Sequence, residues 1–268
     1  EVAEERVTLA GPPPRVLIVR SFPLPDEGAL ATIDDVTERY RLDSVRTDFV
    51  SNISHELKTP VGAISILAET LEGETDDDLV KRLAGRMVAE SHRMARTIDD
   101  LLELSRIEAG KLELVTQPLD VREIAAQAIQ AVTQQAQAKG LTLYSQIADA
   151  LPVHRSGDAL RLSQVLINLL ANAVKFTRHG SVALTIDSLH DGDVLRFVVR
   201  DTGPGLSTQE QQRVFDAFHQ VERPAGEQLG GAGLGLTITR ELVGLMSGHL
   251  DLRSTLGVGT QVEIVLPM

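Results

Sequence analysis

The stretch SNISHELKTP, residues Ser51–Pro60, lies within a long helical pattern that decides how the first half of the chain folds. On both sides of it, apolar residues recur at spacings of three, four or seven, which is the seam of a helix from about residue 34 to Gly73. A second seam begins after an acidic turn, where Thr75 or Asp76 would cap it, and stops near Gly110. Two long helices joined by a short turn predict an antiparallel hairpin.

The expected hairpin carries one apolar stripe on each helix, and two stripes alone leave an apolar face uncovered. Pairing with a second copy of the chain as a four-helix bundle covers that face. We therefore expect a homodimer.

Within the quoted stretch, His55 is expected to point outward. Residues two apart on a helix lie on roughly opposite sides, and the apolar residues Ile53 and Leu57 flank His55 at that distance. An isolated histidine is usually a core residue or an indifferent surface residue, and this periodicity excludes the core. Pro60 disrupts the helix at a cost of ~3 kcal/mol, and a kink beside an exposed imidazole favours a functional site. Neutral imidazole is a good nucleophile, and Glu56 beside it could accept the ring proton.

Composition and charge exclude several classes of protein. With 268 residues the chain is long enough for about two domains, and no apolar run approaches the ~18 residues of a membrane-spanning helix. A net charge of −12 argues against nucleic acid or an anionic membrane surface as the partner, and the absence of cysteine excludes disulfides and thiolate metal sites. We expect a cytoplasmic fragment, without nucleic-acid or direct membrane contact, of a longer protein that can itself be membrane-anchored.

The pattern is different on either side of the helical hairpin. Two β-like runs, Arg15–Arg20 and Gly28–Ile33, predict a β-hairpin before it. After it, helical and strand patterns predict an α+β sandwich, in which one sheet carries helices on one face. The expected helices are Val121–Ala138, Asp158–Phe176 and Gly233–Ser247, and the expected strands are Leu141–Ile147, Ser181–Leu189, Val194–Asp201, Leu250–Ser254 and Gly259–Leu266.

One predicted helix in the second half has a polar face that suits a nucleotide. The spacing of Asn168, Asn172 and Lys175 places two amides and an ammonium on the same side. Amide oxygens suit a hydrated Mg²⁺, and the ammonium suits phosphate oxygens. Taken alone, this face could equally be an ordinary solvated surface.

Two glycine-containing segments suit the same ligand. Asp201 ends an apolar strand and is followed by Gly203 and Gly205, so its carboxylate could accept a hydrogen bond from an exocyclic amine while the backbone turns closely around a flat ring. Each such segment alone also fits a plain turn. The cluster Gly230–Gly235 precedes a helix, whose free N–H groups and positive end could hold a triphosphate. It lacks the Lys-Ser/Thr ending of a P-loop.

Together these segments resemble a bacterial sensor histidine kinase. His55–Pro60 is followed in order by the asparagine segment, by Asp201-x-Gly-x-Gly, by a pair of phenylalanines and by a glycine-rich loop, and this joint order is very specific. The match covers residues 41–268, and Asp48–Ser54 resembles the subgroup of the phosphate-regulon sensors. The resemblance implies a dimeric phosphotransfer hairpin followed by an ATP-binding domain of the Bergerat (GHKL) type.

The resemblance also implies roles for individual residues. His55 would accept the phosphoryl group of ATP, Glu56 would act as the base, and Thr59 would position a water that dephosphorylates the partner. That partner would be the receiver domain of a response regulator, which is phosphorylated on an aspartate. In the ATP-binding domain, Asn172 with help from Asn168 would ligate Mg²⁺, and Lys175 would contact the phosphates. Asp201 would recognise the adenine in a pocket shaped by Gly203 and Gly205. A mobile lid would be anchored by Phe215 and Phe218 and would end at Gly231, Gly233 and Gly235.

The implied organisation has four parts. They are a partial PAS-like hairpin and linker at 1–40, the dimerisation and phosphotransfer hairpin at 41–110, a hinge linker at 111–119 and the catalytic domain at 120–268. One position departs from the family, because Ala232 stands where a hydroxyl residue is frequent. Contacts to phosphate at Ala232 are therefore expected from the backbone alone.

Two other functions are compatible with parts of the pattern. An ATP hydrolase of the gyrase-like or chaperone-like kind uses a glutamate at the start of the asparagine segment to activate water, and Asn168 at that position disfavours it. A nonenzymatic scaffold or a dominant phosphatase would use the helical dimer only to bind a regulator. The intact nucleotide motifs argue against a pure scaffold, whereas Thr59 keeps phosphatase activity open as a second function.

Overall fold

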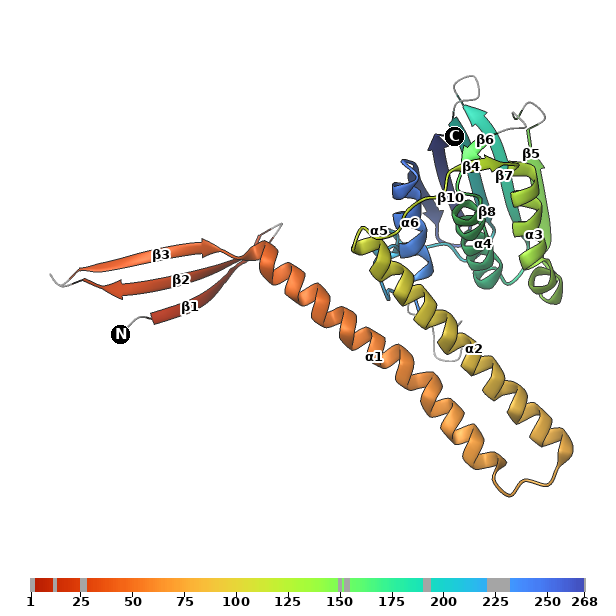
Figure 1. Ribbon diagram of the computed structural model, residues 1–268, viewed down its shortest axis with the longest axis horizontal. Coiled ribbons are helices and arrows are strands. Elements are labelled where there is room, and N and C mark those ends of the chain that lie inside the picture. Colours follow the sequence, from red (N-terminus) through yellow and green to blue (C-terminus); the bar gives the residue numbers. More distant parts are fainter. Residues whose placement is uncertain are drawn as a thin grey trace. The chain divides into compact units, whose positions relative to one another are not determined.

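The computed structural model describes residues 3–11, 14–24, 28–148, 151, 155–189, 194–220 and 232–267, with the backbone alone over 41–49. The chain forms two compact units, Glu1–Thr59 and Pro60–Met268, and each is considered by itself (Figure 1). None of the helices in these described ranges combines the length and the apolar character that a bilayer crossing requires.

The first unit begins with a small antiparallel sheet. Its strands are β1 (Ala3–Leu9), β2 (Arg15–Pro23) and β3 (Ala29–Asp35), in the order β1-β2-β3. Only the last two strands were expected. β1 carries consecutive charged residues, and these hide its alternation in the sequence. In the sheet one of them, Glu4, is paired with Arg20 on β2 at 2.8 Å, and Arg20 also binds Asp34 on β3 at 2.9 Å.

Two long helices follow the sheet. α1 spans Thr37–Leu71 and continues through Pro60, and α2 spans Asp77–Glu108. Asp76 is the residue that caps α2, since its carboxylate accepts from the backbone N–H groups of Asp78 at 2.9 Å and Leu79 at 3.1 Å. Within the second unit, the last turns of α1 and the helix α2 run in opposite directions, as predicted for a hairpin (Figure 1).

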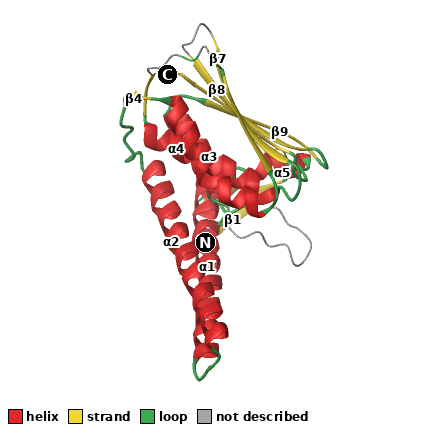
Figure 2. Ribbon diagram, turned by 90° about the vertical axis from the view of Figure 1, so that its right-hand side faces the viewer, coloured by secondary structure: helices red, strands yellow, loops and turns green. Residues whose placement is uncertain are grey.

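The rest of the second unit is the predicted α+β sandwich. A five-stranded sheet has the order β5-β7-β8-β10-β9, in which β5 and β7 are parallel and the other neighbours are antiparallel. Figure 2 shows α3 and α4 stacked on one face of this sheet. The elements are α3 (Val121–Ala138), β5 (Thr142–Ile147), α4 (Ala159–Phe176), β7 (Ser181–Leu189), β8 (Val194–Asp201), α6 (Gly235–Leu245), β9 (His249–Thr255) and β10 (Gly259–Pro267).

The helix α4 shows why this layer forms. Asp158 caps its start by accepting from the N–H of Arg161 at 3.0 Å. Its apolar residues recur every three or four positions and face the core, whereas its three polar site residues lie on another side. The buried residues of α4 are Leu162, Val165, Leu166, Leu169, Leu170, Ala173 and Val174.

Three short elements were not expected from the sequence. β4 (Gln117–Leu119) pairs with β6 (Arg155–Gly157), and α5 (Thr208–Arg213) follows β8. Elements of three to six residues contain too little periodicity to be recognised. β4 covers the end of the expected hinge, 111–119, so the pairing with β6 ties that end to the rest of the second unit. The hinge itself stays a prediction, and bending is expected before β4.

Candidate active site

A cavity of about 520 Å³ lies between the helices and one end of the sheet. This volume is within the range of about 300–1,000 Å³ that is usual for small-molecule sites. The cavity collects residues from α4, from the end of β8 and from the start of α6. Seven residues singled out in the sequence line it, namely Asn168, Asn172, Lys175, Asp201, Gly205, Gly233 and Gly235.

Asp201 is held at the cavity by its own hydrogen bonds. Its Oδ1 accepts from the backbone N–H of Gly203 at 2.7 Å and from that of Thr260 on β10 at 3.3 Å. Burial raises the pKa of Asp201 above its ordinary value, and these two hydrogen bonds partly oppose the rise. Because both bonds go to Oδ1, the geometry leaves Oδ2 as the atom that can meet a ligand donor.

The glycines after Asp201 are required by close packing. A Cβ on Gly205, where φ is +69°, would lie 2.1 Å from the backbone oxygen of Thr255. A Cβ on Gly203 would lie 2.8 Å from the Asp201 carboxylate and disturb the hydrogen bond just described. These glycines therefore let the backbone turn tightly against β9 and beside Asp201.

The polar face of α4 is connected to the start of α6. Asn168 Nδ2 donates to the backbone oxygen of Gly235 at 2.8 Å, and a Cβ on Gly235 would press against the Asn168 amide. With Nδ2 engaged in this way, the oxygen Oδ1 of Asn168 is the atom suited to a cation or a bound water. Within the described ranges, His, Cys, Asp and Glu side chains form no group of three or more that could hold a metal ion by themselves. A cation at this site would need amide oxygens and oxygens of the ligand, which is the manner in which Mg²⁺ usually accompanies phosphates.

The phenylalanine pair is fastened to the same glycine segment. The backbone oxygen of Phe215 accepts from Thr237 Oγ1 on α6 at 2.9 Å. The N–H of Phe218 donates to the backbone oxygen of Gly233 at 3.2 Å. Both predicted lid anchors therefore contact the beginning of α6. Gly231 lies outside the described residues, as does most of the predicted lid.

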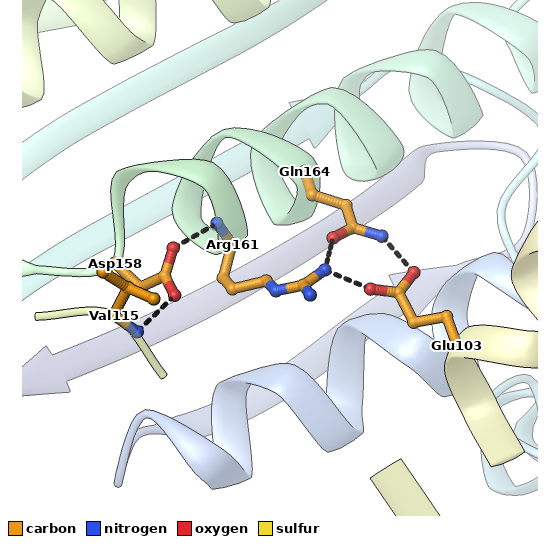
Figure 3. Close-up of polar contacts among 5 residues, drawn as sticks. All are labelled: Glu103, Val115, Asp158, Arg161 and Gln164. Atoms are coloured by element: carbon orange, nitrogen blue, oxygen red, sulfur yellow. Dashed lines mark hydrogen bonds and ion pairs between the residues drawn. The ribbon is translucent and has the colours of Figure 1, made fainter. Parts of the chain in front are cut away.

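Helix α2 packs on α4 through a polar cluster that the sequence did not reveal (Figure 3). The carboxylate of Glu103 accepts from the guanidinium of Arg161 and from Nε2 of Gln164, both on α4. The Arg161 guanidinium also donates to Gln164 Oε1 at 2.9 Å. Nearby, Asp158 accepts from the N–H of Val115 at 2.9 Å. The first turns of α4 are thus held by α2 and by the linker.

One turn before Glu103, Asp100 reaches the cavity from α2. Burial, reinforced by the negative charges of Glu103 and Asp99, raises the pKa of Asp100 to about 6, while Arg96 acts in the opposite direction. No signal in the sequence separates Asp100 from the other acidic residues of α2, because its position at the cavity depends on the packing of α2 against the nucleotide domain.

Replacing Asp100 by asparagine is expected to stabilise the protein at neutral pH. The pKa of Asp100 in the folded chain lies above its ordinary value of 3.8, so the ionised carboxylate costs stability. That cost is absent below about pH 4 and complete above about pH 6. Allowing for partial solvent exposure, we expect D100N to gain about 1–2 kcal/mol, or about 2–6 °C in melting temperature, at pH 7.5 and nothing at pH 4. Thermal melts at both pH values measure this, with E108Q as the control, because Glu108 is exposed on α2 and its charge is not among those that shift the pKa of Asp100. An equal gain at pH 4 and 7.5 would contradict the ionisation argument.

The predicted phosphoacceptor residues lie in the first unit, on α1. His55 is exposed, as its position relative to Ile53 and Leu57 predicted, and Glu56 is half-buried. The hydroxyl of Thr59 is exposed and donates to the backbone oxygen of His55 at 3.2 Å. The imidazole is therefore accessible to another molecule or domain.

Two protein-family models match consecutive parts of the chain. The model described as the "His Kinase A (phospho-acceptor) domain" matches residues 45–110, and the model described as "Histidine kinase-, DNA gyrase B-, and HSP90-like ATPase" matches residues 157–268. The first contains His55 and the second contains every predicted nucleotide residue. The chain belongs to the histidine kinase family. The predicted fold class, a helical region followed by a GHKL-type ATP-binding domain, is confirmed.

Individual histidine kinases are similar over most of the chain. The sensor-like histidine kinase SenX3 of Mycolicibacterium smegmatis is 37% identical over 241 residues, which are 89% of this chain and 62% of SenX3. Full-length ShkA, solved in complex with AMPPNP, has a TM-score of 0.63 and 31% identity over 82% of this chain and 45% of its own. ThkA, solved in complex with the response regulator protein TrrA, has the same TM-score at 20% identity over 98% of this chain and 79% of its own. At this identity the comparison supports a shared fold and no more. This histidine kinase chain thus spans less than two thirds of SenX3 and less than half of ShkA. Neither family model reaches residues 1–44, and the PAS-like remnant and the phosphate-regulon subgroup stay predictions.

Proposed function

We propose that this chain phosphorylates itself on His55 with ATP and passes the phosphoryl group to an aspartate of a response regulator. The observation that carries the proposal is the cavity, where seven predicted nucleotide residues from distant parts of the sequence meet. An exposed histidine in a phosphoacceptor domain supplies the nucleophile. The partner's class is supported by the family and by the complex of ThkA with its response regulator.

The chemistry consists of two phosphoryl transfers. A ring nitrogen of His55 attacks the γ-phosphorus, the bond from that phosphorus to the bridging oxygen breaks, and ADP leaves. The ring loses its proton to a base, a role that we assign to Glu56. In the second transfer, the regulator's aspartate attacks the same phosphorus and the P–N bond breaks. Catalysis in such transfers is mostly positioning and neutralisation of charge.

Within the cavity we assign the ends of the nucleotide by chemistry. The adenine amine would donate to Asp201, whose Oδ2 is not used by the backbone. The phosphates would lie at the start of α6, near Lys175 and the glycines Gly233 and Gly235, since free N–H groups at a helix N-terminus bind anions. Asn172, with Asn168, would hold Mg²⁺ together with the phosphate oxygens, and the ion would neutralise the transferred charge. Phe215 and Phe218 would anchor the lid.

Labelling of the purified chain tests the proposed activity. Incubation with Mg²⁺ and γ-³²P-ATP should give a protein-bound label that is labile in acid and stable in alkali, as a phosphorus–nitrogen bond is. An acid-stable label would indicate a hydroxyl acceptor and contradict the proposal. Hydrolysis of ATP without any label would favour the ATP hydrolase.

Thr59 supports phosphatase activity as a second function. Its exposed hydroxyl lies one helical turn after His55, where it can hold a water near a regulator docked on this helix. We expect T59A to slow dephosphorylation of the phosphorylated regulator by about 10–100-fold while autophosphorylation changes less than twofold. Release of phosphate from labelled regulator measures this rate, and S51A on the same exposed face is the control. Full phosphatase activity in T59A would remove this function from Thr59.

The helices also support a dimer. Large apolar side chains are exposed on both, including Ile66 at 65% on α1 and Leu102 at 55% on α2. A four-helix bundle would bury such residues, so light scattering at micromolar concentration should give twice the mass of one chain. We expect I66E to weaken the dimer at least tenfold, whereas E69Q, on the same helix, leaves it unchanged. A monomeric mass for the unmodified chain would contradict the dimer.

A further inference from the structure

The ring nitrogen Nε2 of His219 has no role in the site described so far. His219 lines the cavity, and its Nε2 is shielded from water without a hydrogen-bond partner in the part of the chain that the structure describes. Buried polar groups are nearly always paired, because an unpaired one lowers stability. An exception at the wall of a binding site indicates that the ligand supplies the missing bond.

The backbone around His219 is strained in a way that fixes its position. Phe218, the residue before it, has φ +62°, a conformation that bulky residues rarely adopt. Two hydrogen bonds hold this conformation, one from the Phe218 N–H to the Gly233 oxygen at 3.2 Å and one from the His219 N–H to the Asp216 oxygen at 3.2 Å. A Cβ on Gly233 would lie 2.9 Å from the His219 oxygen, so the two segments are in close contact.

This contact places His219 beside the segment that leads into α6. Gly233 lies two residues before Gly235, the first residue of α6, which itself lies against Asn168. Among the described residues no side chain caps this helix start, so its positive end can meet a ligand. Asp201 and Gly205, which also line the cavity, instead contact Thr260 on β10 and Thr255 on β9. His219 is therefore beside the part of the cavity that suits negative charge.

We propose that His219 binds the phosphate chain of the nucleotide by donating Nε2–H to a phosphate oxygen. The bond satisfies the unpaired nitrogen, and the strained turn at Phe218 supplies a rigid support for it. The inference rests on the proposed function only in requiring that ATP or ADP occupies this cavity. It extends that function by adding a side-chain donor to a phosphate site in which Ala232 offers none.

Competition binding against a fluorescent nucleotide tests the role of His219, with ADP as the phosphate-containing probe and adenosine as the phosphate-free one. H219F keeps a planar ring and removes the donor, whereas H219Q keeps an amide N–H at a similar distance from the backbone. We expect H219F to bind ADP about tenfold more weakly, because a hydrogen bond to a charged oxygen is lost, with adenosine affinity unchanged within a factor of two. H219Q should recover most of the loss, and H249F, at an exposed position on β9, should bind both probes normally.

Several outcomes would overturn the assignment. They are unchanged ADP affinity in H219F, an equal loss for ADP and adenosine, and a loss in H219Q as large as in H219F. If H219F lowers the melting temperature, H219L provides the same comparison of the two probes in a smaller side chain. Binding is measured without phosphoryl transfer, so a failure of His55 labelling leaves this test intact. Failure of the unmodified chain to bind ADP would overturn both proposals.

Discussion

Replacing His55 by glutamine is expected to remove the acid-labile phosphate label while ATP affinity stays within a factor of two of the unmodified chain. Glutamine resembles histidine in size and polarity but has no nucleophilic ring nitrogen, so the first transfer has no acceptor. ATP affinity is retained because every residue assigned to the nucleotide lies in the other compact unit. Labelling with γ-³²P-ATP and a nucleotide-binding titration measure the two quantities on the same preparation, and the label is expected to fall at least 100-fold.

The matched control is H92Q, at a second exposed histidine, on α2. It should label at the normal rate. A label that persists in H55Q would place the acceptor elsewhere and refute the assignment of His55. Loss of ATP binding in H55Q would show that the two units are not independent in binding and contradict the two-module organisation.

The second large effect is expected at Asp201. In D201N, the asparagine oxygen can still accept from the N–H groups of Gly203 and Thr260, so the local fold should be kept. The other carboxylate oxygen becomes an NH₂ donor, which faces the adenine amine donor with no hydrogen bond possible. We expect ATP affinity to fall by about 100-fold, since a site built to pair a polar group strongly rejects a mismatched one.

Stability distinguishes this loss of binding from unfolding. Burial raises the pKa of Asp201, so its charge costs stability at neutral pH, and that cost disappears as the pH falls through the pKa of the folded state. The neutral asparagine should therefore melt at the same temperature as the unmodified chain or higher at pH 7.5. D251N, at the β9 carboxylate that pairs with Arg253, controls for removal of a charge outside the cavity. Unchanged ATP affinity in D201N would refute the assignment of the adenine site.

Much of the fold could be predicted because local periodicity reports which face of an element is buried. The alternation in β7 and β8 predicted their bounds correctly, and α4 begins one residue after its expected start because Asp158 is its cap. The elements that escaped prediction are those in which this signal is short or masked. β4 and β6 have three residues each. In β1 the charged residues mask the alternation, and the ion pairs of Arg20 with Glu4 of β1 and Asp34 of β3 form only in the folded sheet.

The residues of the site likewise include some that the sequence predicted and others that only the structure revealed. The sequence by itself determined which polar groups α4 and β8 bring to the cavity, because Asn168, Asn172 and Asp201 lie at fixed positions within or at the end of single elements. It also determined that His55 faces outward, since this follows from the helical period alone.

Only the tertiary structure decided which distant segments meet. It brought Asp100 from α2 to the cavity, joined Glu103 to α4, and set His219 against Gly233 with a buried nitrogen that no described residue pairs. The physical reason is that burial and hydrogen-bond satisfaction depend on what surrounds a group in three dimensions, and an acidic residue or a histidine has the same local pattern whether it lies beside water or beside a ligand.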